Sequence, residues 1–144
     1  MGFEKFEQLV SAFNRGSLDI PDGFLSSNTT YSLNGVSYES LIGRTADDAL
    51  VRMLTRGAAA YRTAAKALHY ALQRPVMTLE MMSGPDEAGA RTAHLRIEGR
   101  LRDSGLVFST VFRLILRSEA DRVVAMDADC APDDLRRISD ARKQ

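Results

Sequence analysis

The sequence predicts an α+β fold built on an antiparallel sheet. Residues 91–130 are typical of three consecutive strands joined by short polar turns at 103–105 and 118–121. From Thr92 to Leu101, polar and apolar side chains alternate, which indicates a strand with one face on a core. Apolar residues at helical spacing occur outside this region, near the N-terminus and between residues 45 and 72.

Composition and charge limit the classes of function. The chain of 144 residues is expected to form one domain, 1–144. Its 19 basic and 19 acidic residues cancel, so no broad field attracts nucleic acid or an acidic membrane. No apolar run approaches the roughly 20 residues of a spanning helix. A single cysteine without a Cys/His cluster offers no structural metal site. We expect a cytoplasmic protein with no metal, no cofactor, no nucleic-acid partner and no membrane partner.

A helix and a hairpin are predicted first. Five apolar residues share one face of a helix that ends at Gly16. They are Phe3, Phe6, Leu9, Val10 and Phe13. Residues 19–27 predict a turn with a short helical piece. Asn34-Gly35 separates β-prone runs at 29–33 and 36–40, and because both turn residues tolerate positive φ, the pattern predicts a β-hairpin.

A second helix is predicted from Thr45, since Thr45-Ala-Asp-Asp48 resembles a capping box. Its apolar spacing continues to Leu72, and an unbroken helix of that length has about 28 residues and spans roughly 42 Å. Gly57 weakens the middle, and Pro75 stops any helix before it. A strand at 76–82, a loop at 84–89 and a short helix at 132–138 complete the prediction.

Several short motifs occur in a particular order along nearly the whole chain. They are residues 13–19, Asn34-Gly35, Gly43-Arg44, residues 121–129 and Pro132. In this order they resemble the NTF2-like superfamily, in its SnoaL-like and scytalone-dehydratase-like small-molecule branch. The resemblance implies a cone, in which a curved, mainly antiparallel sheet wraps around N-terminal helices and leaves a central pocket. It also implies a homodimer through the sheet.

The resemblance bears on residues 62–74, which the residue pattern leaves open between helix and strand. Relatives have a shorter helix after the Gly-Arg pair and then a long strand. Residues 69–75 of this chain resemble the start of that strand. The resemblance therefore implies a helix break near 57–61 and a bulged strand from Lys66, against the helical periodicity.

The resemblance also implies acid and base groups on the pocket strands. Asp127 and Asp129 share one parity of the last strand, and a carboxylate in an apolar pocket has a raised pKa that suits a base. His69, with an unperturbed pKa of about 6.5, exchanges the proton with one of them. The opposite register, with both aspartates on an outer face, stays open, as does a structural role for His69.

Aromatic and apolar residues are predicted to hold the ligand. A phenol can polarise a substrate carbonyl, and the four tyrosines of the chain are all candidates. They are Tyr31, Tyr38, Tyr61 and Tyr70. Tyr31 or Tyr38 is expected to hold the substrate oxygen, while Met53, Phe108, Thr110 and Phe112 line the pocket. The predicted function is binding of a small hydrophobic ligand, with cofactor-free isomerisation, dehydration or cyclisation as the reactions this chemistry allows.

One alternative is a hydrolase. Arg96 and Glu98, with a last-strand aspartate, resemble the site of limonene-epoxide-hydrolase-like members, in which these groups activate a water. Tyr31 and Asn34 would supply that family's Tyr and Asn. This interpretation needs Arg96 and Glu98 to point inward; otherwise they belong to a charge-paired outer stripe.

The other alternative is a non-catalytic binding or dimerisation module. Thr110 and Phe112 are then ordinary core residues. Alternate residues of the same strand form an interface stripe between two copies of the chain. They are Ser109, Val111, Arg113 and Ile115.

Overall fold

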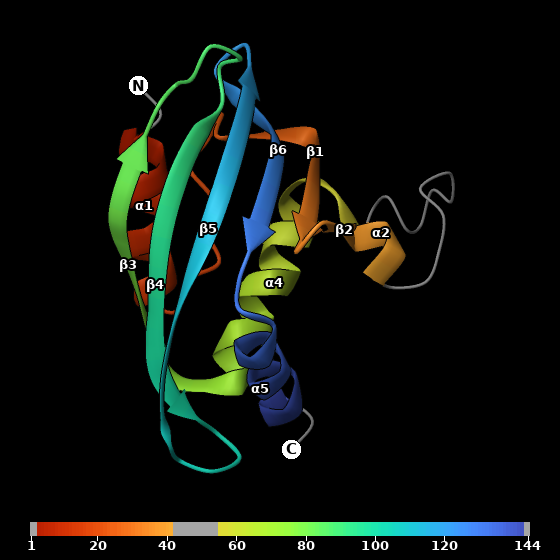
Figure 1. The fold of residues 1–144 in the computed structure, drawn as a ribbon. Coiled ribbons are helices and arrows are strands. Elements are labelled where there is room, and N and C mark those ends of the chain that lie inside the picture. Colours follow the sequence, from red (N-terminus) through yellow and green to blue (C-terminus); the bar gives the residue numbers. More distant parts are fainter. Residues whose placement is uncertain (1–2, 42–54, 143–144) are drawn as a thin grey trace.

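The structure, a computed structural model, describes residues 3–41 and 55–142 (Figure 1). Its elements in chain order are α1 (Phe3–Asn14), β1 (Leu25–Leu33), β2 (Val36–Ser37), α2 (Tyr38–Leu41), α4 (Gly57–Ala71), β3 (Leu72–Ser83), β4 (Arg91–Leu101), β5 (Val107–Glu119), β6 (Arg122–Asp129) and α5 (Pro132–Arg142). Helix α1 ends before Gly16, which has a φ of 77°, as the sequence predicts.

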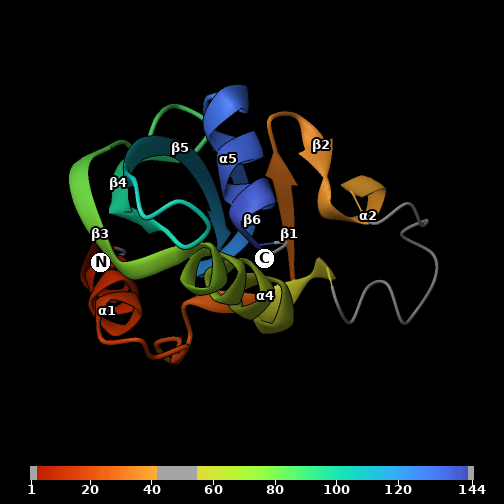
Figure 2. The same ribbon diagram turned by 90° about the horizontal axis from the view of Figure 1, so that it is seen from below.

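The strands form one curved sheet in the order β2-β1-β6-β5-β4-β3. Strands β1 and β6 run parallel, and the other neighbours are antiparallel. Figures 1 and 2 show α1 beside β3, α4 across from β1, and α5 next to α4 at the lower end of the sheet. This arrangement confirms the predicted α+β fold, in which a curved sheet wraps around helices.

The predicted alternation along β4 is confirmed. Ala93, Leu95 and Ile97 are buried against the helices, whereas Arg96 and Glu98 lie on the outer face. Strand β5 follows the same rule, with Leu114 and Leu116 buried. The period of two in the sequence therefore fixes which face of the sheet meets the core.

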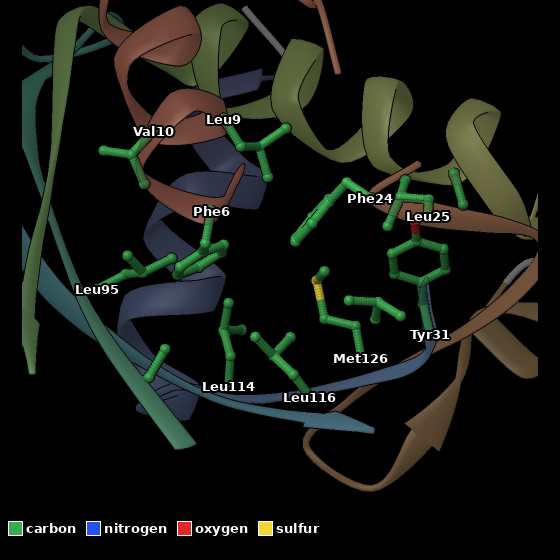
Figure 3. Packing of buried hydrophobic residues seen from close by; sticks show 13 residues of the cluster. Phe6, Leu9, Val10, Phe24, Leu25, Tyr31, Leu95, Leu114, Leu116 and Met126 are labelled. Carbon is green, nitrogen blue, oxygen red and sulfur yellow. The ribbon is translucent and has the colours of Figure 1, made fainter. Parts of the chain in front are cut away.

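Apolar side chains fill the space between α1 and the sheet (Figure 3). Phe6 and Leu9 of α1 meet Leu95 of β4 and Leu114 of β5, and Phe24 stacks near Phe6 with ring centroids 6.1 Å apart. A second cluster lies at the α5 end. It consists of Ala71, Leu72, Ile97, Leu101, Phe108, Ile138 and Ala141.

The N-terminal hairpin differs from its prediction at both ends. Asn34 and Gly35 form the predicted turn, with φ values of 50° and 81°. Strand β1 begins at Leu25 rather than residue 29 and no short helix precedes it, because the backbone of Phe24 already accepts a hydrogen bond from Val123 of β6. The second strand ends at Ser37, after which the chain continues as α2 at the β2 edge of the sheet (Figure 1).

The predicted strand from Lys66 is wrong. Helix α4 continues to Ala71, and β3 begins at Leu72. Helical spacing decides the outcome, because it places Ala60, Ala65 and Ala71 in buried positions. The predicted break near residue 57 is confirmed, but the predicted helix start at Thr45 lies outside the described residues.

The break itself depends on Gly57. Arg56 is extended, with φ −131° and ψ 161°, and Gly57 has a φ of 65°. A Cβ atom on Gly57 would lie 2.7 Å from the carbonyl oxygen of Ser27 in β1. Only glycine combines this backbone conformation with so close an approach to the neighbouring strand.

We expect Gly57→Ala to lower the free energy of unfolding by about 3 kcal/mol, because the new methyl adds a clash to the strained φ. Gly16→Ala is the matched control: it also has positive φ, at 77°, but a Cβ there meets nothing within 4 Å. It should cost about 1 kcal/mol. Urea unfolding measures the stability of both variants. Equal losses of stability would show that the short distance to Ser27 does not exclude a Cβ atom at position 57.

Candidate functional site

Three tyrosines gather at one edge of the main core. Tyr31 comes from β1, Tyr38 from α2 and Tyr61 from the second turn of α4. The rings of Tyr31 and Tyr38 stack with centroids 5.2 Å apart, and Figure 3 shows Tyr31 beside Met126 with its hydroxyl toward α4. That hydroxyl donates a hydrogen bond of 2.8 Å to the carbonyl oxygen of Gly57.

Burial keeps these phenols neutral. It raises the pKa of Tyr31, and the nearby Tyr38 and Tyr61 raise it further. Burial also raises the pKa of Tyr38, and that of Tyr61 to about 12. The Tyr31 hydroxyl already donates its hydrogen bond to the Gly57 carbonyl oxygen. Within residues 3–41 and 55–142, the hydroxyls of Tyr38 and Tyr61 form no hydrogen bond, so each can serve a ligand.

An ion pair between a buried carboxylate and a partly exposed arginine lies next to this cluster in the chain, and the sequence did not reveal it. The carboxylate of Glu39, a residue only 7% exposed, accepts a hydrogen bond of 2.8 Å from Nε of Arg56. Burial opposes ionisation of Glu39, but the Arg56 hydrogen bond and charge outweigh it and lower the pKa. The pair ties α2 to the start of α4. No local pattern in the sequence indicates this pair, because Glu39 stands between Tyr38 and Ser40 and Arg56 between Thr55 and Gly57.

His69 lies on α4, away from the tyrosines. Its ring contacts Phe13 of α1 at 4.4 Å between centroids, and its Nε2 atom is buried without a hydrogen-bond partner. Burial lowers the pKa of His69; the backbone carbonyl of Phe13 opposes this, and the charge of Arg102 adds to it. The residue is therefore a neutral packing group between α1 and α4.

Asp127 and Asp129 lie on the outer face of β6, so the prediction that they face the pocket is wrong. Asp127 accepts hydrogen bonds of 2.7 Å from both Ser32 and Arg117, and Asp129 pairs with Arg113 at 3.0 Å. Met126, of opposite parity, fills the inner face. The structure thus brings neither aspartate near His69 or the tyrosines.

The groups of the predicted hydrolase site also point elsewhere. Arg96 pairs with Glu80 at 2.8 Å on the outer face and also reaches Ser109, as in a charge-paired stripe. Glu98 is exposed on the same face. The Asn34 side chain bonds both the N–H and the carbonyl of Cys130, at 2.8 and 3.0 Å. The hydrolase interpretation is therefore wrong in its geometry.

The predicted lining residues of β5 share the inner face. Phe108 and Thr110 are buried beneath α5, and Phe112 contacts both core clusters. Phe108 belongs to the cluster at the α5 end and Tyr31 to the main core, so the predicted site divides into two places. Met53 lies outside the described residues.

A groove between α1 and β3 contains none of the predicted residues. It has a volume of about 450 Å³ and is open to solvent. Asn14 lies in it and pairs with both backbone groups of Met77, at 2.7 and 2.9 Å. In the described part of the chain, no three His, Cys, Asp or Glu residues are grouped to hold a metal ion. No described helix is both long and apolar enough to span a membrane.

Stability should depend on pH through His69. Its folded pKa lies below the unfolded value of about 6.5, so the unfolded state binds the proton more readily. The contribution of neutral His69 to the free energy of unfolding is therefore fully present above about pH 6.5, and it is lost as the pH falls below that value. His69→Phe, which keeps the contact with Phe13, should flatten this dependence in urea unfolding at several pH values.

The other histidine provides the control. His94 lies half-buried on β4, and His94→Asn should leave the acid loss of stability in place. A His69→Phe protein that loses stability with falling pH as steeply as the parent would contradict the role given to His69.

Comparisons with known proteins locate the fold. No protein-family model matches the sequence, and no curated protein matches it either. Solved structures do match. TsrD from Streptomyces laurentii superposes with a TM-score of 0.68 at 17% identity, over 94% of this chain and 92% of that one.

Two further structures carry descriptive names. A putative SnoaL-like polyketide cyclase from Jannaschia sp. has a TM-score of 0.64 at 11% identity, covering 97% of this chain and 90% of that one. A hypothetical protein with a ketosteroid isomerase-like fold from Catenulispora acidiphila, in complex with trimethylamine, has a TM-score of 0.57 at 11% identity, covering 87% of this chain and 83% of that one. The curved sheet, the helices inside it and these superpositions together show that the chain has the NTF2-like fold of the SnoaL-like proteins.

Proposed function

We propose that the protein binds a small hydrophobic molecule with a carbonyl or hydroxyl oxygen at the Tyr31–Tyr38–Tyr61 cluster. The observation that carries this proposal is the pair of partly buried tyrosines, Tyr38 and Tyr61, whose hydroxyls have no hydrogen bond to a described residue. Both rings pack against the apolar core. A hydroxyl at the edge of an apolar core can hydrogen-bond a ligand oxygen while the neighbouring rings cover the apolar part of the ligand.

The cluster favours an uncharged ligand oxygen as acceptor. Neutral phenols donate hydrogen bonds, and the raised pKa of Tyr61, about 12, keeps it protonated at neutral pH. Such donors polarise a carbonyl in a site of low polarity. Names such as polyketide cyclase among proteins of this fold agree with a ligand that is apolar and bears oxygen.

The proposal is one of binding rather than of a particular reaction. Isomerisation, dehydration or cyclisation needs a base beside the ligand. The bases expected from the sequence are separated: His69 packs on Phe13, while Asp127 and Asp129 are paired with arginines on the outer face. We expect Asp129→Asn to leave ligand affinity unchanged.

The homodimer and the cytoplasmic location remain proposals. Ser109, Arg113 and the half-buried Val111 and Ile115 do lie on the outer face of β5. This mixed face fits pairing with a second copy through the sheet. Sedimentation at high concentration tests the dimer, and a strict monomer would exclude it.

Two probes that differ in one oxygen test ligand binding. Acetonaphthone presents a carbonyl, whereas ethylnaphthalene has a similar shape without it. Tyr38→Phe and Tyr61→Phe should each weaken acetonaphthone binding by about tenfold, the loss of one useful hydrogen bond. Affinity for ethylnaphthalene should stay the same. Tyr70→Phe is the control, because Tyr70 is 70% exposed on the far side of α4.

Calorimetric titration or probe fluorescence measures these affinities, the latter helped by the absence of tryptophan from the chain. Equal losses for both probes would show that the hydroxyls do not contact the ligand. Binding of neither probe would remove the support for a hydrophobic site at the cluster.

A further inference from the structure

The turn between β4 and β5 carries two exposed apolar side chains. Leu106 is 59% exposed, and Val107, the first residue of β5, is 70% exposed. The turn is hydrogen-bonded: the N–H of Gly105 donates to the carbonyl of Leu101, and the N–H of Leu101 donates to that of Leu106. Figure 1 shows it at the lower end of the sheet, past the ends of α4 and α5. Both exposed side chains are therefore held at one end of the molecule, outside the two core clusters.

Two exposed arginines lie beside these apolar side chains. Arg100 is opposite Val107 in the ladder between β4 and β5, and its guanidinium donates a hydrogen bond of 3.0 Å to the carbonyl of Gly105. Arg102 lies in the turn, and its Nε donates a hydrogen bond of 3.2 Å to the carbonyl of His69. The second bond ties the turn to the end of α4.

A third exposed arginine belongs to the same end of the sheet. Gln73, near the start of β3, lies opposite Arg100 of β4, and Arg74 follows it at the register shift with a φ of 50°. Figure 2, seen from below, shows the start of β3 beside the turn. We call Arg74 and residues 100–107 together the β4–β5 end. Asp103 is the one acidic residue in this set.

The positive charge of the β4–β5 end is not neutralised by ion pairs. Within residues 3–41 and 55–142, none of its three arginines has a carboxylate partner. Arg96, Arg113 and Arg117 of the same sheet are each paired with a carboxylate. Since the whole chain is neutral, the rest of the molecule carries the opposite surplus. Such a distribution orients a protein in the field of a negative surface.

We propose that the β4–β5 end docks on the surface of a lipid bilayer that contains anionic phospholipids. Its three guanidinium groups bind headgroup phosphates, while Leu106 and Val107 enter the adjoining apolar layer. Composition alone predicted no membrane partner, because the charges cancel over the whole chain. The fold, however, gathers unpaired positive charge around exposed apolar side chains at one end.

The exposed apolar pair favours a bilayer over a nucleic acid as the partner. A bilayer removes Leu106 and Val107 from water, whereas a phosphate backbone leaves them exposed. The β4–β5 end also contains no aromatic residue on which an unpaired base could stack. The proposal is independent of the ligand proposed at the tyrosine cluster, since no residue of that cluster belongs to the β4–β5 end.

Sedimentation with vesicles tests the docking. In low salt, the protein should bind vesicles of phosphatidylcholine and phosphatidylserine at least about tenfold more tightly than vesicles of phosphatidylcholine alone. The reason is that each basic residue near an anionic surface contributes a factor of about five. High salt should remove most of this difference. Absence of binding to the mixed vesicles in low salt, or equal binding to both kinds, overturns the proposal.

Serine substitutions test the apolar contribution. Leu106→Ser combined with Val107→Ser should weaken binding to the mixed vesicles by at least about tenfold, because less apolar surface leaves water. Val36→Ser is the control, since Val36 is also an exposed valine at the start of a strand, β2, at the far edge of the sheet. Circular dichroism checks that the variants fold. An unchanged affinity of the double variant overturns the proposal.

Glutamine substitutions test the charges. Arg100→Gln should weaken binding to the mixed vesicles by about fivefold. Arg122→Gln is the matched control, because Arg122 is also exposed and its guanidinium likewise donates to a backbone carbonyl, that of Leu25. Equal losses in the two variants would show that the protein has no preferred face toward the bilayer, which contradicts docking through the β4–β5 end.

A tryptophan placed in the turn reports insertion, because the chain has none of its own. The emission of Leu106→Trp should shift to shorter wavelength with the mixed vesicles, and that of Val36→Trp should not. A protein that sediments with the vesicles without this shift at position 106 overturns the insertion. Single-stranded RNA is the competitor: RNA that displaces the mixed vesicles and binds the Leu106→Ser, Val107→Ser variant as tightly as the parent would make the end a nucleic-acid site instead.

Discussion

The close passage of α4 over β1 is the constraint on which the rest of the arrangement depends. Gly57 has a positive φ, and its backbone lies so close to β1 that a Cβ atom on it would be 2.7 Å from the Ser27 carbonyl oxygen. The Tyr31 hydroxyl then bonds the Gly57 carbonyl, and the Glu39–Arg56 pair holds α2 against the same helix start. Strand β1, helix α2 and the start of α4 meet there, and their meeting brings the tyrosines together.

Asparagine side chains complete the sheet in two places where backbone partners end. Asn14 bonds both backbone groups of Met77 on the edge strand β3, and Asn34 does the same for Cys130 just beyond β6. In each case a carboxamide stands in for a neighbouring peptide group, because it has the same donor and acceptor. At β3 this also occupies part of an edge that a second strand would otherwise use.

The fold was more predictable from the sequence than the site. Alternation along residues 92–101 and the Asn34-Gly35 turn are local signals, so they gave the correct strands and hairpin. For Lys66 to Ala71 the helical periodicity was correct and the family resemblance was misleading. The prediction of the site failed because the sequence does not show which face of the last strand meets the core. Asp127 and Asp129 share one face and Met126 lies on the other, and the core packs against Met126. The Glu39–Arg56 pair joins residues 17 positions apart across a helix start, and no local pattern encodes that contact.

The parallel pairing of β1 with β6 has a consequence for the order in which the chain folds. Thr29 bonds Val123 across a sequence separation of 94 residues, and Asn34 bonds Cys130 across 96. On the ribosome, β1 therefore waits for its only long neighbour until almost all of the described chain has emerged. Contacts of such long range slow folding. Until β6 emerges, the backbone groups along one edge of β1 have no strand to pair with, and an unpaired edge of this kind favours association between incompletely folded chains.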